Sequence, residues 1–352
     1  MSRFLSSRYA GLKPYVPGEQ PRGMQNLVKL NTNESPFAPT PAVVQAAARA
    51  AENLQLYSDP SCFALHAKLA ECYGVKPCQV LAGNGSDELL FFAFTAFCDA
   101  NTPVAFPDIS YGFYPVFAQL CNIEARPVPL REDFTVDPAS YAKAGCTVVI
   151  ANPNAPTGMA LSLGQVAEIC RTNSENVVII DEAYVDFGGS SAVALLDEFP
   201  NLLVVRTFSK SRSLAGGRLG FALGSEDLIA DLGAVKYSFN PYSVNSMTMA
   251  AGIATLEEPQ VMQANCQTII ENRAYTVREL ERLGFCVLPS SANFVFARHE
   301  RLGGLEVFEA LRARGVLVRH FETGRLAPFN RISIGSLEQM QALVKALEEI
   351  VR

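Results

Sequence analysis

The sequence predicts an α/β protein, with a mostly parallel central sheet in a large domain and a smaller α+β domain. Three observations lead to this fold class. Short apolar segments alternate with helical patterns in the middle of the chain, which is typical of a layered α/β domain. The C-terminal third instead carries a few strand-like segments followed by helices. The length of 352 residues corresponds to about two domains of average size.

The N-terminal segment, residues 1–35, is expected to run as an extended arm. Its first thirty residues show little apolar periodicity. Residues that favour turns and extended chain recur there, at Pro14, Pro17, Gly18, Pro21 and Gly23.

The middle of the chain contains the strands of the predicted sheet. Four short, apolar segments lack polar alternation, as strands buried on both faces of a parallel sheet do. They are Thr147–Ala151, Val177–Ile180, Leu202–Val205 and Leu219–Leu223, and helical patterns cover Glu88–Cys98 and Leu163–Arg171. We therefore expect a large domain over residues 36–255.

A different pattern marks the C-terminal end, where we expect a small domain over residues 256–352. It opens with a long amphipathic helix over Gln260–Leu283. Strand-like segments follow at Phe285–Leu288, Asn293–Ala297, Val316–Arg319 and Arg331–Ile334, with helices at Leu305–Arg314 and Leu337–Val351.

Composition and charge exclude several classes of protein. Hydrophobic residues make up 49% of the chain and charged residues 18%, so the protein is globular rather than disordered. The formal net charge of −6 argues against nucleic-acid binding as the main function, because that function requires a basic face. The apolar runs are far shorter than the roughly 20 residues of a membrane span, so no membrane partner is expected.

Cysteine and histidine usage points to a reducing compartment and to no metal. The nine cysteines are scattered without CxxC pairs, and we interpret them as reduced residues of a cytoplasmic protein. No apolar secretory segment opens the chain. The three histidines, His66, His299 and His320, have no partner at ligand spacing, so no metal site is predicted.

Two residues at predicted strand ends are candidates for chemistry. Lys210 closes the segment Thr207–Lys210 directly after an apolar strand, at the edge where α/β sheets bind ligands. A desolvated lysine there becomes a nucleophile for Schiff-base chemistry, although a surface lysine fits the same pattern. Asp181 ends a buried strand, where a carboxylate needs a cationic partner such as a protonated pyridine nitrogen. A helix N-cap is the other interpretation of Asp181.

Three further motifs are suited to a phosphorylated ligand. The glycines of Gly83–Glu88 precede a helical run, so free N–H groups can approach a phosphate. Arg218 lies among small residues and can fork onto a phosphate, and the turn Asn152–Gly158 carries amides that can hold a ligand oxygen. Taken singly, these motifs are also a helix cap, a surface arginine and a simple turn. All five motifs in this one order are improbable by chance.

With these motifs the chain resembles the fold-type-I pyridoxal-phosphate aminotransferases, and within them it is most similar to the histidinol-phosphate aminotransferases. The resemblance covers nearly the whole chain. It is carried by the motifs above and by Lys13–Gly18, Leu30–Pro36, Tyr57–Pro60, Asp181–Tyr184, Arg206–Lys210, Gly216–Gly220, Ser291–Phe294, Gly315–Arg319 and Arg331–Gly335. It implies an aspartate-aminotransferase-like fold and pyridoxal 5′-phosphate as the cofactor.

The resemblance also implies how the cofactor would be held. Lys210 would form the Schiff base and then move a proton between the substrate Cα and the cofactor. Asp181 would pair with the ring nitrogen, Tyr184 would hydrogen-bond the phenolic oxygen and Tyr111 would stack on the ring, although Tyr111 also fits as an ordinary core aromatic. The phosphate would be held by Gly85, Ser86, Asp87, Thr207, Ser209 and Arg218, and by Tyr57 from the other subunit of a homodimer.

The substrate side of the family site needs cations. Arg319 and Arg331 match the family's substrate arginines, which would bind the phosphate of L-histidinol phosphate and the α-carboxylate of glutamate. Apart from the family, the two arginines fit equally well as surface charges at strand ends. Tyr15 and Asn33 would line the same pocket from the arm.

The sequence departs from the family at Ala155, where an asparagine usually precedes the Pro-Thr-Gly. Asn154 or Asn152 is expected to replace that asparagine, or Tyr184 acts alone. The segment Ser211–Leu214 is more polar than in the family and Gly217 replaces a leucine. These changes bear on the phosphate contacts and not on the Schiff base.

Two other functions remain open at this point. An aromatic amino-acid aminotransferase or a threonine-phosphate decarboxylase would use the same fold and cofactor. A non-catalytic protein that retains the fold, such as the sensor half of a regulator, would also carry many of these residues.

Overall fold

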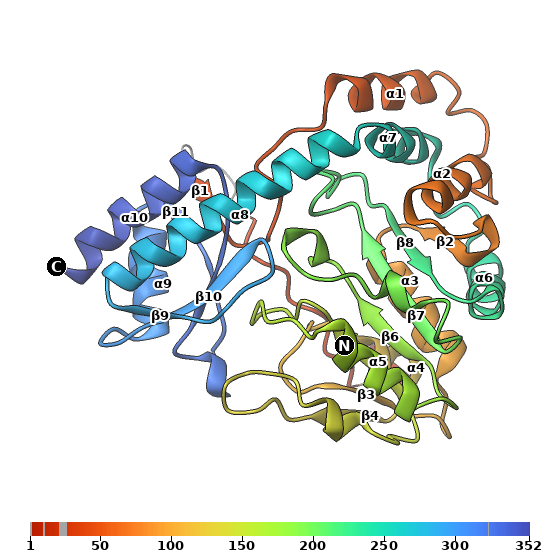
Figure 1. Cartoon of the computed structure of the whole chain (residues 1–352), viewed down its shortest axis with the longest axis horizontal. Helices are drawn as coiled ribbons and strands as arrows, with labels where there is room; N and C mark the ends of the chain where they lie inside the picture. The colour runs from red at the N-terminus through yellow and green to blue at the C-terminus, as the bar shows by residue number, and fades with distance from the viewer. Residues whose placement is uncertain (1, 10, 21–26, 323) are drawn as a thin grey trace.

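The computed structural model describes residues 2–9, 11–20, 27–322 and 324–352. Pro21 and Gly23 of the predicted arm lie outside these ranges. Two lobes make up the chain (Figure 1). The large lobe comprises the elements from α1 to α7, and the small lobe comprises β1 and the elements from α8 to α10.

A seven-stranded sheet forms the centre of the large lobe. Its strands lie in the order β2-β8-β7-β6-β5-β3-β4. Their bounds are β2 (Val80–Gly83), β3 (Val104–Pro107), β4 (Ala125–Val128), β5 (Thr147–Ala151), β6 (Val178–Asp181), β7 (Leu202–Thr207) and β8 (Gly220–Leu223). Every neighbouring pair is parallel except those of β8, which runs antiparallel to both β2 and β7. The prediction of a mostly parallel sheet is confirmed. Strand β8 departs from it, because residues 208–219, which join it to β7, contain no helix that could cross over the sheet.

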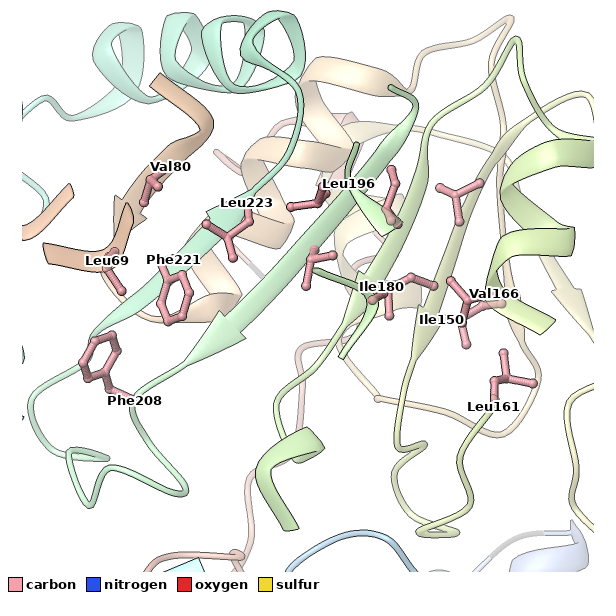
Figure 2. Packing of buried hydrophobic residues seen from close by; sticks show 14 of the residues in the cluster. Leu69, Val80, Ile150, Leu161, Val166, Ile180, Leu196, Phe208, Phe221 and Leu223 are labelled. Carbon is pink, nitrogen blue, oxygen red and sulfur yellow. The ribbon is translucent and has the colours of Figure 1, made fainter. Parts of the chain in front are cut away.

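Both faces of this sheet are covered, which explains its uninterrupted apolar strands. Val148 and Ile150 of β5 belong to one hydrophobic cluster, whereas Val149 and Ala151 belong to the cluster on the opposite face. Figure 2 shows the first face, where Ile150 and other strand residues meet helical and loop side chains. The helices of the large lobe are α1 (Pro41–Ala51), α2 (Phe63–Tyr73), α3 (Ser86–Phe97), α4 (Tyr114–Cys121), α5 (Leu163–Thr172), α6 (Glu226–Phe239) and α7 (Ser246–Glu257).

The helix ends of the large lobe follow from local capping. The Ser162 hydroxyl accepts a hydrogen bond from the Gln165 backbone N–H, and the Gln165 side chain accepts one from the Ser162 N–H. This capping box fixes the start of α5 where the sequence predicts it. Predicted helix α3 begins two residues earlier than expected, at Ser86, directly after Gly85 in the positive-φ region (φ +87°).

The small lobe is built on a four-stranded antiparallel sheet in the order β12-β13-β10-β9. Its elements are α8 (Pro259–Arg282), β9 (Phe285–Val287), β10 (Phe294–His299), α9 (Gly304–Ala313), β11 (Val316–Leu317), β12 (Arg319–His320), β13 (Asn330–Ser333) and α10 (Leu337–Val351). Helix α8 runs from the large lobe across to the small one (Figure 1). The expected single strand over 316–319 is divided, because its two halves pair in different sheets.

The C-terminal end of the arm is part of the small lobe. Strand β1 (Val28–Lys29) pairs in parallel with β11, and Leu30 is buried in the core of the small lobe. A short 3₁₀ turn, Ser7–Tyr9, is the one other regular element of the described arm. Among the described residues no helix is both long and apolar enough to cross a membrane.

Candidate active site

A cavity of about 720 Å³ lies where the two lobes and the arm meet. The carboxyl ends of β2, β3, β5, β6 and β7 all contribute residues to it, which is where open α/β sheets bind ligands. Most of the predicted site residues line it together: Tyr15, Asn33, Ser86, Asp87, Tyr111, Asp181, Tyr184, Thr207, Ser209, Lys210, Arg218, Arg319 and Arg331.

Lys210 reaches the cavity from the loop after β7. Its Nζ donates a hydrogen bond to the Thr32 carbonyl oxygen at 3.2 Å. The same Nζ lies 5.7 Å from the centroid of the Tyr184 ring. The Lys210 amine is therefore held at the cavity wall by the Thr32 carbonyl and the face of the Tyr184 ring. It has no ion-pair partner among the described residues, so it can react with a ligand in the cavity.

Asp181 is the last residue of β6 and is almost fully buried, with 4% of its surface exposed. Its Oδ2 accepts a hydrogen bond from the Tyr114 hydroxyl at 2.9 Å, and its Oδ1 accepts one from the Ala183 N–H at 3.2 Å. Burial raises the pKa of this carboxyl from 3.8 to about 7. An ionised Asp181 therefore calls for a cation in the cavity, which a protonated pyridine nitrogen supplies.

An anion site is formed at the N-terminus of α3. Gly85 precedes the helix, and a Cβ at this position would lie 2.6 Å from Nη2 of Arg218. Nη1 of Arg218 lies 3.5 Å from the Ser209 hydroxyl, which accepts a hydrogen bond from Thr207 at 3.0 Å. A guanidinium, hydroxyls and helix N–H groups thus converge, as phosphate sites require.

Tyr111 and Asp87 close the other side of this anion site. The Tyr111 hydroxyl donates a hydrogen bond to Oδ1 of Asp87 at 2.7 Å, and Oδ2 of Asp87 lies 3.3 Å from Nη2 of Arg218. Burial and the Asp87 charge raise the pKa of Tyr111, so its hydroxyl stays a donor. The Tyr111 ring is fixed at the cavity wall and offers a face for a planar ligand.

Arg319 and Arg331 occupy directly opposed positions of β12 and β13. Opposed residues of an antiparallel pair point to the same face, and like charges there repel. Nη2 of Arg331 donates to the Asn31 carbonyl oxygen at 3.1 Å, and its buried Nε has no partner among the described residues. Burial lowers the pKa of Arg331. Two facing guanidinium groups beside a cavity are suited to bind anions.

The arm forms the outer wall of the cavity with its residues 14–18. The Tyr15 ring stacks on Phe113 at 4.2 Å between centroids. Both Nη atoms of Arg319 donate to arm carbonyls, to Pro17 at 3.4 Å and to Val16 at 3.2 Å. Arg319 therefore contributes to the cavity and also holds the arm across it.

The amide that lies beside the Tyr184 hydroxyl belongs to Asn33 of the arm and not to the turn Asn152–Gly158. Nδ2 of Asn33 donates to the Tyr184 hydroxyl at 3.1 Å, and Ala155 lines the cavity nearby. Asn154 is occupied elsewhere, by Ser110, Thr157 and the Ile109 carbonyl. Asn152 is bonded to the backbone of Leu161. Neither asparagine of the turn lines the cavity, so the expectation that one of them replaces the family asparagine finds no support in this geometry.

Two further predicted residues do not line the cavity. Gly85 directly precedes Ser86, and its missing side chain leaves space for the Arg218 guanidinium. Tyr57 is exposed on the surface, with 84% of its area accessible, and stacks on Tyr242 at 4.6 Å. Its contribution to a site therefore depends on a second subunit.

Sequence reasoning missed several polar residues beside the site. Tyr114 begins an apolar helix and has no motif to mark its contact with Asp181. Arg206 forms buried ion pairs with Glu182 and Asp186, and the Ser211 hydroxyl donates to Asp186 at 2.5 Å. The contacts of Arg206 and Ser211 tie the segments on both sides of Lys210 to Glu182 and Asp186. In the sequence, only the presence of charged residues beside apolar runs could have pointed to these ion pairs.

Known proteins match this chain over most or all of its length. The family described as aminotransferase class I and II matches residues 25–347. A histidinol-phosphate aminotransferase from Chromohalobacter salexigens is 49% identical over 100% of both chains, and one from Pseudomonas fluorescens Pf-5 is 47% identical over 99% of this chain and 100% of the relative. The solved Sinorhizobium meliloti histidinol-phosphate aminotransferase, in complex with pyridoxal-5′-phosphate, has a TM-score of 0.84 at 26% identity and covers 92% of this chain and 90% of its own.

Proposed function

The chain belongs to the class I and II aminotransferases, and from this membership we propose that it transfers the amino group of L-histidinol phosphate to 2-oxoglutarate, in histidine biosynthesis. It is an aminotransferase that uses pyridoxal 5′-phosphate. The observation that carries the choice of substrates is the facing pair Arg319 and Arg331, since both substrates are anions.

The residues of the cavity fit the cofactor. The buried Asp181 calls for a cation, and the anion site at α3 calls for a phosphate at the other end of the same cavity. When bound, pyridoxal phosphate supplies an electron sink that stabilises negative charge at the substrate Cα. Asp181 would face its ring nitrogen, Tyr111 its ring face and Arg218 its phosphate.

Lys210 is proposed to act as nucleophile and as general acid and base. Its amine is the only lysine amine among the residues that line the cavity. As general base and acid, the Lys210 amine would take the proton from the substrate Cα and deliver it to the cofactor, whose ring would hold the electron pair. Tyr184 and Asn33 would hold the phenolic oxygen through their mutual hydrogen bond.

The two substrates are proposed to use the same arginines in turn. L-histidinol phosphate carries a phosphate and no carboxylate, whereas 2-oxoglutarate carries two carboxylates. Arg331 is enclosed by the rings of Phe294 and Phe321, at 5.4 and 6.0 Å from their centroids. The Arg319 guanidinium lies closer to solvent, and we propose that it binds the phosphate. Tyr15 from the arm would shield both from water.

A homodimer is proposed, in which Tyr57 reaches the phosphate site of the second subunit. The support is a set of large apolar side chains that the large lobe leaves exposed, since such side chains often mark an interface. Tyr57 and Tyr242 stack on each other, and Leu54, Leu56, Phe63, Tyr237 and Phe239 are also exposed.

The domain division and the location remain proposals as well. We propose an arm over residues 1–35, a large domain over 36–255 and a small domain over 256–352. The hydrophobic clusters support this division, since Val43 belongs to a cluster of the large lobe and Ile269 to that of the small lobe. Phe37, just past the proposed boundary at residue 36, still packs with the small lobe. A cytoplasmic location is supported by nine cysteines that are all free, three of them exposed.

One spectroscopic experiment tests the proposed reaction. The visible absorption of the purified, cofactor-loaded protein would be recorded before and after L-histidinol phosphate is added without a keto acid. We expect the band to disappear and to return on addition of 2-oxoglutarate. A band that ignores L-histidinol phosphate and responds to an aromatic amino acid would contradict the proposed donor. A protein that takes up no pyridoxal phosphate would contradict the reaction itself.

A further inference from the structure

The carboxylate of Asp181 is held by a tyrosine that no motif of the sequence marks. Tyr114 is the first residue of α4, and its side chain is completely buried. Its hydroxyl donates to Oδ2 of Asp181 at 2.9 Å. Asp181 is the hydroxyl's one hydrogen-bond partner among the described residues. A buried phenol normally finds an acceptor, and here the acceptor belongs to the proposed active site.

The Tyr114 ring is itself fixed by aromatic packing. Its centroid lies 5.8 Å from that of Phe106 and 6.4 Å from that of Phe94. The Tyr111 ring meets it edge to face at 5.7 Å and 84°. This packing fixes the position of the Tyr114 hydroxyl. The hydroxyl can therefore determine the orientation of the Asp181 carboxylate.

Asp181 is bonded from two sides by groups of different elements. Tyr114 holds Oδ2 from α4, and the Ala183 N–H holds Oδ1 from the loop after β6. Burial and the negative charges of Asp87 and Glu182 disfavour the ionised carboxylate, whereas these two donors favour it. The Tyr111 phenol packs against Tyr114 on the same side of the sheet, and burial raises its pKa, so it adds no negative charge. The two donors thus oppose the desolvation cost.

We propose that Tyr114 is a positioning residue for the carboxylate that faces the cofactor's ring nitrogen: its hydroxyl fixes the orientation of Asp181 and favours the ionised form. The inference rests on the proposed role of Asp181. It extends that role to a residue that touches neither cofactor nor substrate.

The test compares Tyr114→Phe, which keeps the ring and removes the hydroxyl, with Asp181→Asn. The first readout is the dissociation constant of pyridoxal phosphate, from titration of the apoprotein. The second is the ¹⁵N NMR signal of bound pyridoxal phosphate labelled at the ring nitrogen. For Tyr114→Phe we expect an affinity loss of about tenfold, the scale of a hydrogen bond to a charged group, and a ¹⁵N signal moved toward the neutral ring.

A matched control separates positioning from stability. Tyr141→Phe removes the hydroxyl of another fully buried tyrosine, packed in the cluster on the opposite face of the sheet. It should move neither readout. Tyr114→Phe combined with Asp181→Asn should bind no more weakly than Asp181→Asn alone, because the two act through one contact.

The outcomes distinguish the inference from its premise. If Asp181→Asn moves both readouts and Tyr114→Phe moves neither, Tyr114 has no positioning role. A weaker affinity in Tyr114→Phe with an unmoved ¹⁵N signal would also overturn the inference, since it indicates a packing effect. If Asp181→Asn itself moves neither readout, the proposed role of Asp181 fails first.

Discussion

The side-chain amide of Asn33 donates a hydrogen bond to the Tyr184 hydroxyl at 3.1 Å, although 151 positions of sequence separate the two residues. Asn33 is held in this position by Ser333, whose hydroxyl donates to Oδ1 of Asn33 at 2.8 Å. The arm thus brings the Asn33 amide to the Tyr184 hydroxyl. The nearby residue Ala155 has no side-chain amide that could do so. We expect this contact to take the place of the asparagine that the family carries at position 155.

We therefore predict that Asn33→Ala weakens cofactor binding and activity more than Asn154→Ala does. The first removes the partner of Tyr184, and we expect roughly a tenfold loss of kcat/KM. The second removes bonds that hold the turn, and we expect a lower melting temperature with a smaller loss of kcat/KM. Steady-state kinetics and thermal unfolding of both variants check this. The reverse order would show that Asn154 turns toward the ligand.

Lys210→Ala is predicted to reduce transamination by at least about a thousandfold, because nucleophile and proton carrier are lost together. The phosphate site at α3 and Asp181 remain in this variant. It should therefore still bind pyridoxal phosphate, measured by equilibrium dialysis. A variant that keeps full activity would contradict the assignment of Lys210.

The residues of the cavity could be predicted where a strand end or a glycine-rich turn marks them. Asp181 ends a buried strand and Lys210 follows another, and the geometry of a parallel sheet brings such strand ends to one edge. Asn33 carries no such mark, because its place depends on a contact with Ser333 at the far end of the chain. Nothing in the sequence marks Tyr114 either, because a tyrosine in an apolar helix usually packs in the core without a functional role. The direction of β8 was also beyond the pattern, because buried parallel and antiparallel strands share the same apolar composition.

Arg331→Met is predicted to raise KM for both substrates at least tenfold, because a forked contact to an anion is lost. The apoprotein should unfold at no lower temperature than the wild type, since the variant removes one of two facing positive charges. Arg298→Met is the control, because Arg298 lies on neighbouring β10, exposed and outside the cavity. An unchanged KM in Arg331→Met would exclude a substrate role.

The raised pKa of Asp181 predicts how the stability of the apoprotein depends on pH. The folded carboxyl has a pKa of about 7 and the unfolded one about 3.8. Between these values the folded state binds a proton that the unfolded state has released, so stability falls as pH rises. The Asp181→Asn apoprotein lacks this group. From pH 4 to pH 7 the wild type should therefore lose roughly 3 kcal/mol relative to the variant, measured by urea unfolding. Parallel stability curves would show that Asp181 stays ionised without a ligand.

Contacts near its two ends hold the arm across the cavity. Arg312 on α9 contacts both carboxylate oxygens of Glu19, at 2.8 and 3.1 Å, just beyond the arm residues that line the cavity. On the other side of that wall, the Gln119 side chain bonds Gly11 and Lys13. The arm is thus tied to the small lobe at one end and to the large lobe at the other.

We expect Arg312→Glu to raise the KM of both substrates about twofold to fivefold with kcat nearly unchanged, because exposed ion pairs are weak. The charge exchange, Arg312→Glu with Glu19→Arg, should restore KM, and high salt should remove the difference between the single variant and the wild type. Arg314→Glu provides the control, since its partner Glu349 lies on α10 and not on the arm. If the exchange fails to restore KM and Arg314→Glu leaves KM unchanged, Arg312 acts on the site through a contact other than the one with Glu19.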